Sequence, residues 1–216
     1  MAVDMNLLKE LREKTQAGIA DCKKALEACG NDMAKAVDYL REKGLSTAVK
    51  KSGRIASEGV VEAYIHGNGR IGVLIEVNCE TDFVARNAIF KQFVKDMAMQ
   101  IAASQPLYIT IEEVPQEALD REAAVLKAQA LNEGKPEKVV EKIVQGRMAK
   151  YYEDFCLLEQ SFVKEPEIKV KDVLTRTIAA LNENIKIRRF VRYEMGEGLA
   201  KKEENFAEEV QKQLKG

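Results

Sequence analysis

The chain has 216 residues, of which 46% are hydrophobic and 32% charged, a balance typical of a soluble globular protein with a real core. Its 34 Lys and Arg residues nearly cancel its 35 Asp and Glu residues, and the net charge of −1 argues against a protein that mainly neutralises nucleic-acid phosphates. We see neither a secretory signal nor an apolar run of the roughly 20 residues that cross a bilayer, and therefore expect a cytoplasmic protein without a membrane segment.

The four cysteines, Cys22, Cys29, Cys79 and Cys156, form no CxxC pair and have no histidine at metal-ligand spacing. His66 is the only histidine and lies in a predicted turn. A Cys–His nucleophile is one alternative, but buried thiols in a reducing compartment are the favoured interpretation. The sequence therefore predicts no metal site, no cofactor and no enzymatic centre.

Residues 1–45 predict a compact module of three short amphipathic helices, which must pack on one another to bury their apolar faces. Gly30 is placed to end the second helix, and Gly44 to end the third. Residues 46–57 are basic and contain a glycine, so they predict a linker. Contact of this linker with phosphate or with an acidic partner is the alternative.

At residue 58 the apolar period changes from helical to strand-like. Residues 60–65 and 71–77 flank a Gly-Asn-Gly turn, which is a strong hairpin signal. Residues 185–193 predict a third strand, because a two-stranded hairpin is marginal alone. Its alternation groups Ile187, Val191 and Tyr193 against Arg188, Phe190 and Arg192.

Helices are predicted over residues 88–104, 116–133 and 136–151 and from a capping Asp172 to residue 182, with residues 106–111 extended. The predicted fold class is α+β, with the N-terminal three-helix bundle followed by a core, residues 58–196, in which helices pack a three-stranded antiparallel sheet. Residues 197–216 predict a helical arm with an apolar stripe: Leu199, Phe206, Val210 and Leu214. The arm could dock on a partner or on its own domain.

Thr81, Asp82, Phe83 and Val84 lie where the second strand gives way to a helix. In one interpretation Thr81 and Asp82 cap the helix while Phe83 and Val84 staple its first turn to the core. In the other, the corner presents an acid and an aromatic outward as a probe for a partner. Spacing does not separate the two.

Five stretches of the sequence resemble the bacterial translation elongation factor Ts family, the nucleotide-exchange factors of elongation factor Tu. They are Thr15-Gln16-Ala17-Gly18-Ile19-Ala20-Asp21-Cys22-Lys23-Lys24-Ala25-Leu26, Arg54-Ile55-Ala56-Ser57-Glu58-Gly59, Glu80-Thr81-Asp82-Phe83-Val84-Ala85-Arg86-Asn87, and Arg189-Phe190-Val191-Arg192 with Gly196-Glu197-Gly198. The N-terminal module then resembles a ubiquitin-associated-type bundle.

The resemblance implies a protein that performs no bond chemistry and binds elongation factor Tu in its GDP-bound and nucleotide-free states. Carried over from the family, Thr81, Asp82, Phe83 and Val84 would reach the partner's magnesium region, and the first module would contact its GTPase domain. No direct nucleic-acid binding is expected.

Longer family members carry a second core repeat and a protruding helical hairpin, and neither is visible between Tyr151 and Asp172. The short form resembles relatives in which two copies pair, so a homodimer is expected as a possibility.

Two other classes are weighed against this one. A ribosome- or RNA-associated protein would use five basic residues: Lys50, Lys51, Arg188, Arg189 and Arg192. A helical adaptor would bind its partner through the N-terminal bundle alone.

Overall fold

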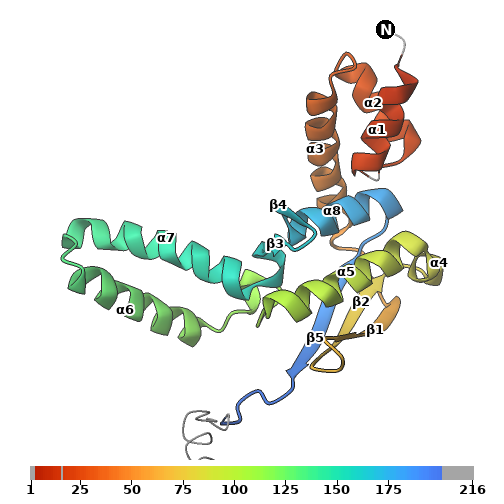
Figure 1. Ribbon diagram of the computed structural model, residues 1–216. Helices are drawn as coiled ribbons and strands as arrows, with labels where there is room; N and C mark the ends of the chain where they lie inside the picture. Colours follow the sequence, from red (N-terminus) through yellow and green to blue (C-terminus); the bar gives the residue numbers. More distant parts are fainter. Residues whose placement is uncertain (1–2, 16, 201–216) are drawn as a thin grey trace, which may run out of the picture.

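The computed structural model describes residues 3–15 and 17–200 and has three visible parts (Figure 1). An N-terminal helical bundle stands at one end, a three-stranded sheet covered by helices forms the centre, and a long helical hairpin projects to the side. The predicted α+β class is confirmed.

The N-terminal bundle consists of α1 (Met5–Thr15), α2 (Ile19–Ala28) and α3 (Met33–Lys51). Their apolar faces form a cluster of their own: Leu8, Leu11, Cys22, Ala25, Leu26, Ala36 and Leu40. Gly30 follows α2 with φ of 63°, the left-handed conformation that ends a helix at least cost for glycine. Asp32 caps α3 by accepting a hydrogen bond from the Lys35 N–H at 3.1 Å.

The prediction that α3 ends at Gly44 is wrong, because the helix continues to Lys51 and takes in residues 46–51 of the predicted linker. Gly44 lies against α8 (Val170–Leu181), where an added Cβ would come within 3.5 Å of Thr175 and 3.6 Å of Ala179. The glycine therefore permits a close approach of two helices instead of ending one, and tertiary packing overrides its low helix propensity.

The central sheet has the strand order β1-β2-β5, all antiparallel, with β1 at Glu58–His66, β2 at Ile71–Cys79 and β5 at Lys186–Glu194. Both the predicted hairpin and the predicted third strand are confirmed. Helix α5 (Ala88–Ser104) covers one face of the sheet.

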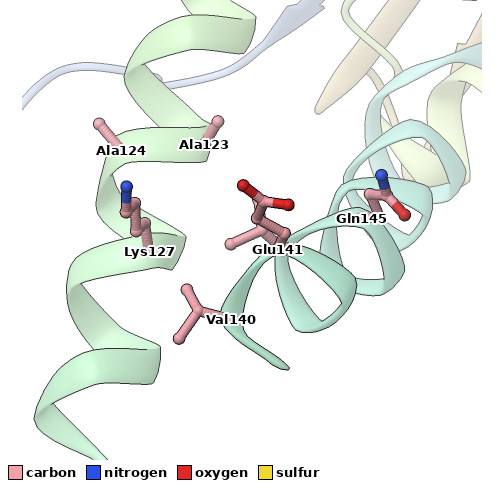
Figure 2. A pocket seen from close by; sticks show the side chains of 7 residues that line it. Ala123, Ala124, Lys127, Val140, Glu141 and Gln145 are labelled. Atoms are coloured by element: carbon pink, nitrogen blue, oxygen red, sulfur yellow. The ribbon is translucent and has the colours of Figure 1, made fainter. Parts of the chain in front are cut away.

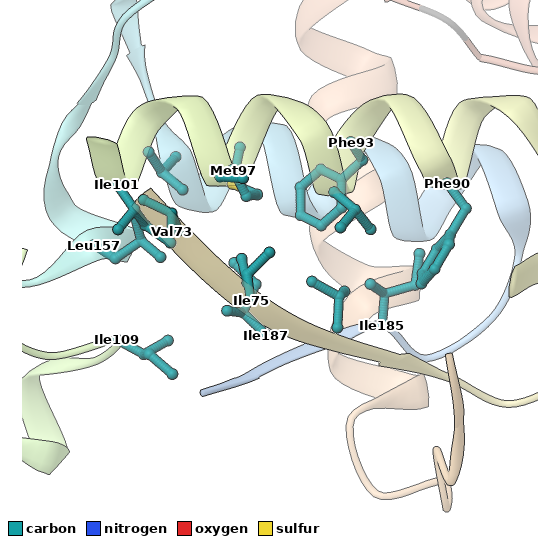
Figure 3. Close-up of a cluster of buried hydrophobic side chains, with 14 of the residues drawn as sticks. Val73, Ile75, Phe90, Phe93, Met97, Ile101, Ile109, Leu157, Ile185 and Ile187 are labelled. Carbon is teal, nitrogen blue, oxygen red and sulfur yellow. The ribbon is translucent and has the colours of Figure 1, made fainter. Parts of the chain in front are cut away.

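Five residues of α5 predicted at helical spacing are all buried: Phe90, Phe93, Val94, Met97 and Ile101. Figure 3 shows Phe90, Phe93 and Met97 projecting from α5 into the cluster that contains Val73 and Ile75 of β2. Each large side chain buried in this way contributes about 1.5–3 kcal/mol of transfer free energy.

The alternation predicted for β5 is wrong in part, because a bulge opposite Glu76 and Val77 changes the faces. Ile187 pairs with Val77 while Arg189 pairs with Glu76, so one extra residue, Arg188, interrupts the strand. As a result Arg192 lies on the buried face with Ile187, and its side chain is only 8% exposed.

Helices α6 (Gln116–Asn132) and α7 (Glu137–Phe155) form an antiparallel hairpin that projects from the core (Figure 1). Its connection turns at Gly134, with φ of 73°, and Arg147 donates to both carboxylate oxygens of Glu133 at 2.9 and 3.0 Å. Figure 2 shows an open groove between the two helices, with Lys127 on one side and Glu141 on the other. The chain thus has a protruding helical hairpin, which corrects the expectation that none is present.

Between α7 and α8 the chain forms elements that the sequence pattern did not reveal. They are one short 3-10 helix, η2 (Leu157–Glu159), and a small sheet of β3 (Ser161–Phe162) and β4 (Glu165–Lys169). Asp172 does not cap α8 at its first position as predicted. It lies in the first turn and accepts from the Lys169 N–H at 3.2 Å.

Most of the predicted C-terminal arm, residues 201–216, lies outside the described residues. Within the described ranges, no helix is long and apolar enough to cross a bilayer.

Gly44→Leu should lower the free energy of unfolding by about 1–3 kcal/mol, because the side chain would force α3 away from α8. Gly146→Leu in α7 is the matched control, since nothing lies within 4 Å of a Cβ added there. In urea unfolding the control should be neutral or stabilised by up to about 1 kcal/mol through helix propensity. Equal effects of the two substitutions would show that α3 and α8 do not depend on their close contact.

Candidate functional site

The strand-to-helix corner contains the four residues singled out in the sequence. Strand β2 ends at Cys79, a short helix α4 spans Asp82–Arg86, and Asn87 caps α5 directly after it. Thr81 is the N-cap of α4, with its hydroxyl oxygen accepting from the Val84 N–H at 3.4 Å. The capping role of Thr81 is therefore confirmed, while Asp82 is the first residue of the helix.

The side chains of α4 divide between core and solvent. Ala85 is buried and Val84 packs against the central core, but Phe83 is 82% exposed. The staple interpretation thus holds for Val84 and is wrong for Phe83. Asp82 lies beside Phe83 in sequence and pairs with Arg86 at 2.9 Å across one turn, on the surface. The corner presents an aromatic and a carboxylate outward.

The backbone of the corner is held by Glu183, which lies in the loop between α8 and β5. One carboxylate oxygen of Glu183 accepts from the N–H groups of Glu80 and Thr81, both at 3.0 Å. The other oxygen accepts from the Thr81 hydroxyl at 2.7 Å. Three hydrogen bonds to one carboxylate fix the turn that leads into α4.

Glu80 extends the same network to the segment that follows α3. Its carboxylate accepts from the Asn184 N–H at 2.6 Å and pairs with Arg54 at 3.4 Å. The Asn184 amide in turn donates to the Arg54 carbonyl at 2.7 Å. The Asn184 N–H, aided by the charge of Arg54, lowers the pKa of Glu80 below its ordinary value.

Sequence reasoning missed Glu183 and Asn184, although a topological signal was present. In an antiparallel sheet, the loop that precedes β5 must lie beside the loop that follows β2. Asn78 pairs with Lys186, so residues 183 and 184 fall next to Glu80 and Thr81. Polar residues at both loops then become candidates for mutual hydrogen bonds.

The Cys79 thiol does not form a nucleophilic pair with His66. Burial raises the pKa of Cys79 to about 11, and its thiol donates to the Thr81 carbonyl at 3.2 Å. His66 is hydrogen bonded to Tyr64 at 3.0 Å and pairs with Ile71 at the far end of β2. Eight strand residues separate the two ends, about 26 Å.

Four of the five basic residues weighed for RNA binding, Lys51, Arg188, Arg189 and Arg192, have partners within the protein. Arg188 and Arg189 both contact Glu76, at 2.9 and 2.6 Å, because the bulge brings these neighbours to the same carboxylate. Lys51 is buried, and its ammonium donates to the Asn182 carbonyl at 2.7 Å. These contacts favour the strand and helix-end interpretations of the cluster.

No group of three or more His, Cys, Asp or Glu side chains that could hold a metal ion occurs among residues 3–15 and 17–200. Cys22, Cys29, Cys79 and Cys156 are free thiols.

Glu80→Gln should reduce stability at neutral pH and weaken its loss in acid. Because the folded pKa of Glu80 is lowered, the stability that its charge contributes is present above the ordinary carboxyl value and disappears as the pH falls through the folded pKa. Urea unfolding between roughly pH 6 and pH 3 would measure this slope. Glu165→Gln, in a half-exposed pair with Arg176, is the control and should leave the slope unchanged.

The sequence model of the family described as elongation factor TS matches residues 5–197. The elongation factor Ts of Carboxydothermus hydrogenoformans is 62% identical over 213 residues, which cover 99% of this chain and 98% of that relative. The elongation factor Ts of Acetivibrio thermocellus is 61% identical, with 99% and 100% covered, and that of Desulfitobacterium hafniense is 59% identical, with 96% and 95% covered. With an exposed Phe83 on the corner and this similarity along nearly its whole length, the chain belongs to the elongation factor Ts family of translation elongation factors.

Proposed function

We propose that the protein is a guanine-nucleotide exchange factor that acts in the cytoplasm during translation elongation. It binds elongation factor Tu with GDP bound and promotes GDP release by disturbing the magnesium and phosphate site. Family membership supports the partner, and the 82% exposure of Phe83 on a braced corner is the single observation that supports the mechanism.

Exchange of this kind needs binding energy and no bond chemistry. A factor that binds the nucleotide-free partner more tightly than the GDP-bound partner weakens GDP binding by the same factor, through linkage. The proposed mechanism therefore needs no acid–base pair. We propose that the protein has no enzymatic activity.

Phe83 is suited to act as a wedge. An aromatic side chain in solvent gains free energy when it enters an apolar site, and a packed protein interior responds to insertion by discrete displacement. Val84 anchors the same helix turn to the core, so the force on the ring is transmitted to the whole domain. Thr81 holds the first turn of α4 by its cap.

Asp82 is free to change partners on binding. Its pair with Arg86 is an exposed contact across one helix turn, and such pairs contribute about 0.3–0.5 kcal/mol. Breaking this pair costs little, so the carboxylate is available to groups around the partner's magnesium ion. Since the ion offsets phosphate charge, displacing it loosens GDP.

We also propose a homodimer formed through the uncovered face of the central sheet. That face carries five exposed apolar side chains, Val61, Ile65, Leu74, Val191 and Tyr193, next to the ion pair of Glu76 with Arg189. Sheets stack face to face at about 10 Å, and a two-fold axis would bring the same apolar patch from each copy together. The place that a second core repeat takes in longer family members would then be filled by a second copy.

We propose no direct nucleic-acid binding, because Arg188 and Arg189 are paired with Glu76 and Lys51 is buried.

Phe83→Ala should slow the release of a fluorescent GDP analogue from elongation factor Tu by about tenfold or more, since the variant loses a transition-state contact. The assay holds magnesium fixed and contains excess unlabelled GDP, and binding to the nucleotide-free partner should persist in weakened form. Leu107→Ala is the control, because Leu107 is 62% exposed and follows the opposite end of α5. Release at the wild-type rate with Phe83→Ala would contradict the wedge.

Leu74→Glu should convert the dimer to a monomer, because it places a charge at the centre of the apolar face. Sedimentation velocity over a concentration series measures the change. Leu107→Glu, off the sheet, should leave the mass unaltered. A wild-type protein that stays monomeric at the highest concentration would contradict the proposed pairing.

A further inference from the structure

We propose that Glu183 is a positioning residue for nucleotide exchange, which rests on the exchange function proposed above. Glu183 holds the turn that leads into α4 in one conformation while Phe83 inserts into the partner. It acts through Thr81 and Glu80, and touches neither the partner's nucleotide nor its metal.

The contacts of Glu183 are concentrated on the turn that leads into α4. Both N–H groups that precede α4 donate to one of its oxygens at 3.0 Å, and the Thr81 hydroxyl donates to the other at 2.7 Å. The hydroxyl of Thr81 is at the same time the cap acceptor for the Val84 N–H. Removing the carboxylate therefore loosens the turn and the helix cap together.

The loop that carries Glu183 is itself held on both sides. Asn182 adopts a left-handed conformation, with φ of 56°, at the end of α8. Asn184 and Ile185 are buried, at 8% and 2% exposure, immediately after Glu183. The carboxylate is thus presented from a preorganised loop, so its contacts with the corner need no further ordering of the loop backbone.

The same loop is hydrogen bonded to the end of α3 and to the residues that follow it. These bonds fix the position of the corner relative to the N-terminal bundle. The Lys51 ammonium donates to the Asn182 carbonyl at 2.7 Å, and the Asn184 amide donates to the Arg54 carbonyl at 2.7 Å. Helix α3 continues without interruption from the bundle to this point. The partner therefore meets two surfaces at a fixed separation.

A wedge transmits force only when its base resists displacement. Helix α4 is five residues long, so its own hydrogen bonds do not make it rigid. Its resistance comes from Val84 in the core and from Glu183 at the turn. Removing the Glu183 contacts should allow the turn before α4 to move when Phe83 inserts. Binding energy would then displace this turn instead of the partner's magnesium site.

The test compares Glu183→Ala and Glu183→Gln in the GDP-analogue release assay, with the protein titrated to saturation. Glu183→Ala should lower the maximal release rate by about tenfold, while the concentration at half-saturation changes by less than about threefold. Glu183→Gln should retain at least about a third of the maximal rate, because its amide oxygen accepts from both N–H groups and its NH₂ donates to the Thr81 hydroxyl.

Glu133→Ala is the matched control, since both carboxylate oxygens of Glu133 also accept hydrogen bonds, here from Arg147, but Glu133 lies on the α6–α7 hairpin at the end of α6. Thermal unfolding of all variants shows whether they remain folded at the assay temperature. If Glu183→Ala does not fold there, Glu183→Asp replaces it, since the shorter side chain withdraws the carboxylate from the turn and leaves the Thr81 cap of α4 unchanged. An unaltered maximal rate for Glu183→Asp would overturn the positioning role in the same way.

The outcomes separate this inference from the function on which it rests. If the wild-type protein fails to accelerate release, the exchange function is wrong. If the wild type accelerates release and Glu183→Ala matches it in maximal rate, the positioning role is wrong. A loss in half-saturation alone, with an unchanged maximal rate, would also overturn it, because Glu183 would then support binding only.

Discussion

The antiparallel pairing of β2 with β5 is the constraint on which the rest of this structure depends. It joins segments that are more than 100 residues apart in the chain, with Asn78 opposite Lys186. This pairing completes the sheet that α5 covers, and it brings the α8–β5 loop to the end of β2. Without it, Glu183 and Asn184 would have no reason to lie beside the corner, and the turn into α4 would lack its acceptors.

The hydrogen-bonded network at the corner links three elements with different tasks. The end of α3 connects the network to the N-terminal bundle. The α8–β5 loop contributes the carboxylate of Glu183, and the corner carries the exposed Phe83. Within the described ranges, no buried side-chain nitrogen or oxygen lacks a hydrogen-bond partner, so the buried polar atoms of this network are all hydrogen bonded. A satisfied polar network defines one geometry, and a single geometry is what an exchange factor needs in order to deform its partner.

Much of the fold follows from local pattern. The apolar spacing of α5, the Gly-Asn-Gly turn and the alternating strands each predicted an element that the structure contains. The failures share one cause, which is contact with a distant segment. Gly44 is inside a helix because α8 packs on it, and the Arg192 side chain is only 8% exposed because a bulge at Arg188 shifts the faces of β5. The hairpin of α6 and α7 was predicted as two helices, but its projection from the core was not.

The sequence by itself determined the positions of most of the long helices, the three strands of the central sheet and the Thr81–Val84 corner, because hydrophobic period and capping chemistry are local properties. Only the tertiary structure decided that Val84 enters the core while Phe83 stays 82% exposed, since neighbouring residues of a short helix face different surroundings. It also decided that Glu183 braces the corner. That contact joins residues 102 positions apart in the chain. It forms because β2 and β5 both bury an apolar face against α5, and only one pairing register places both faces there.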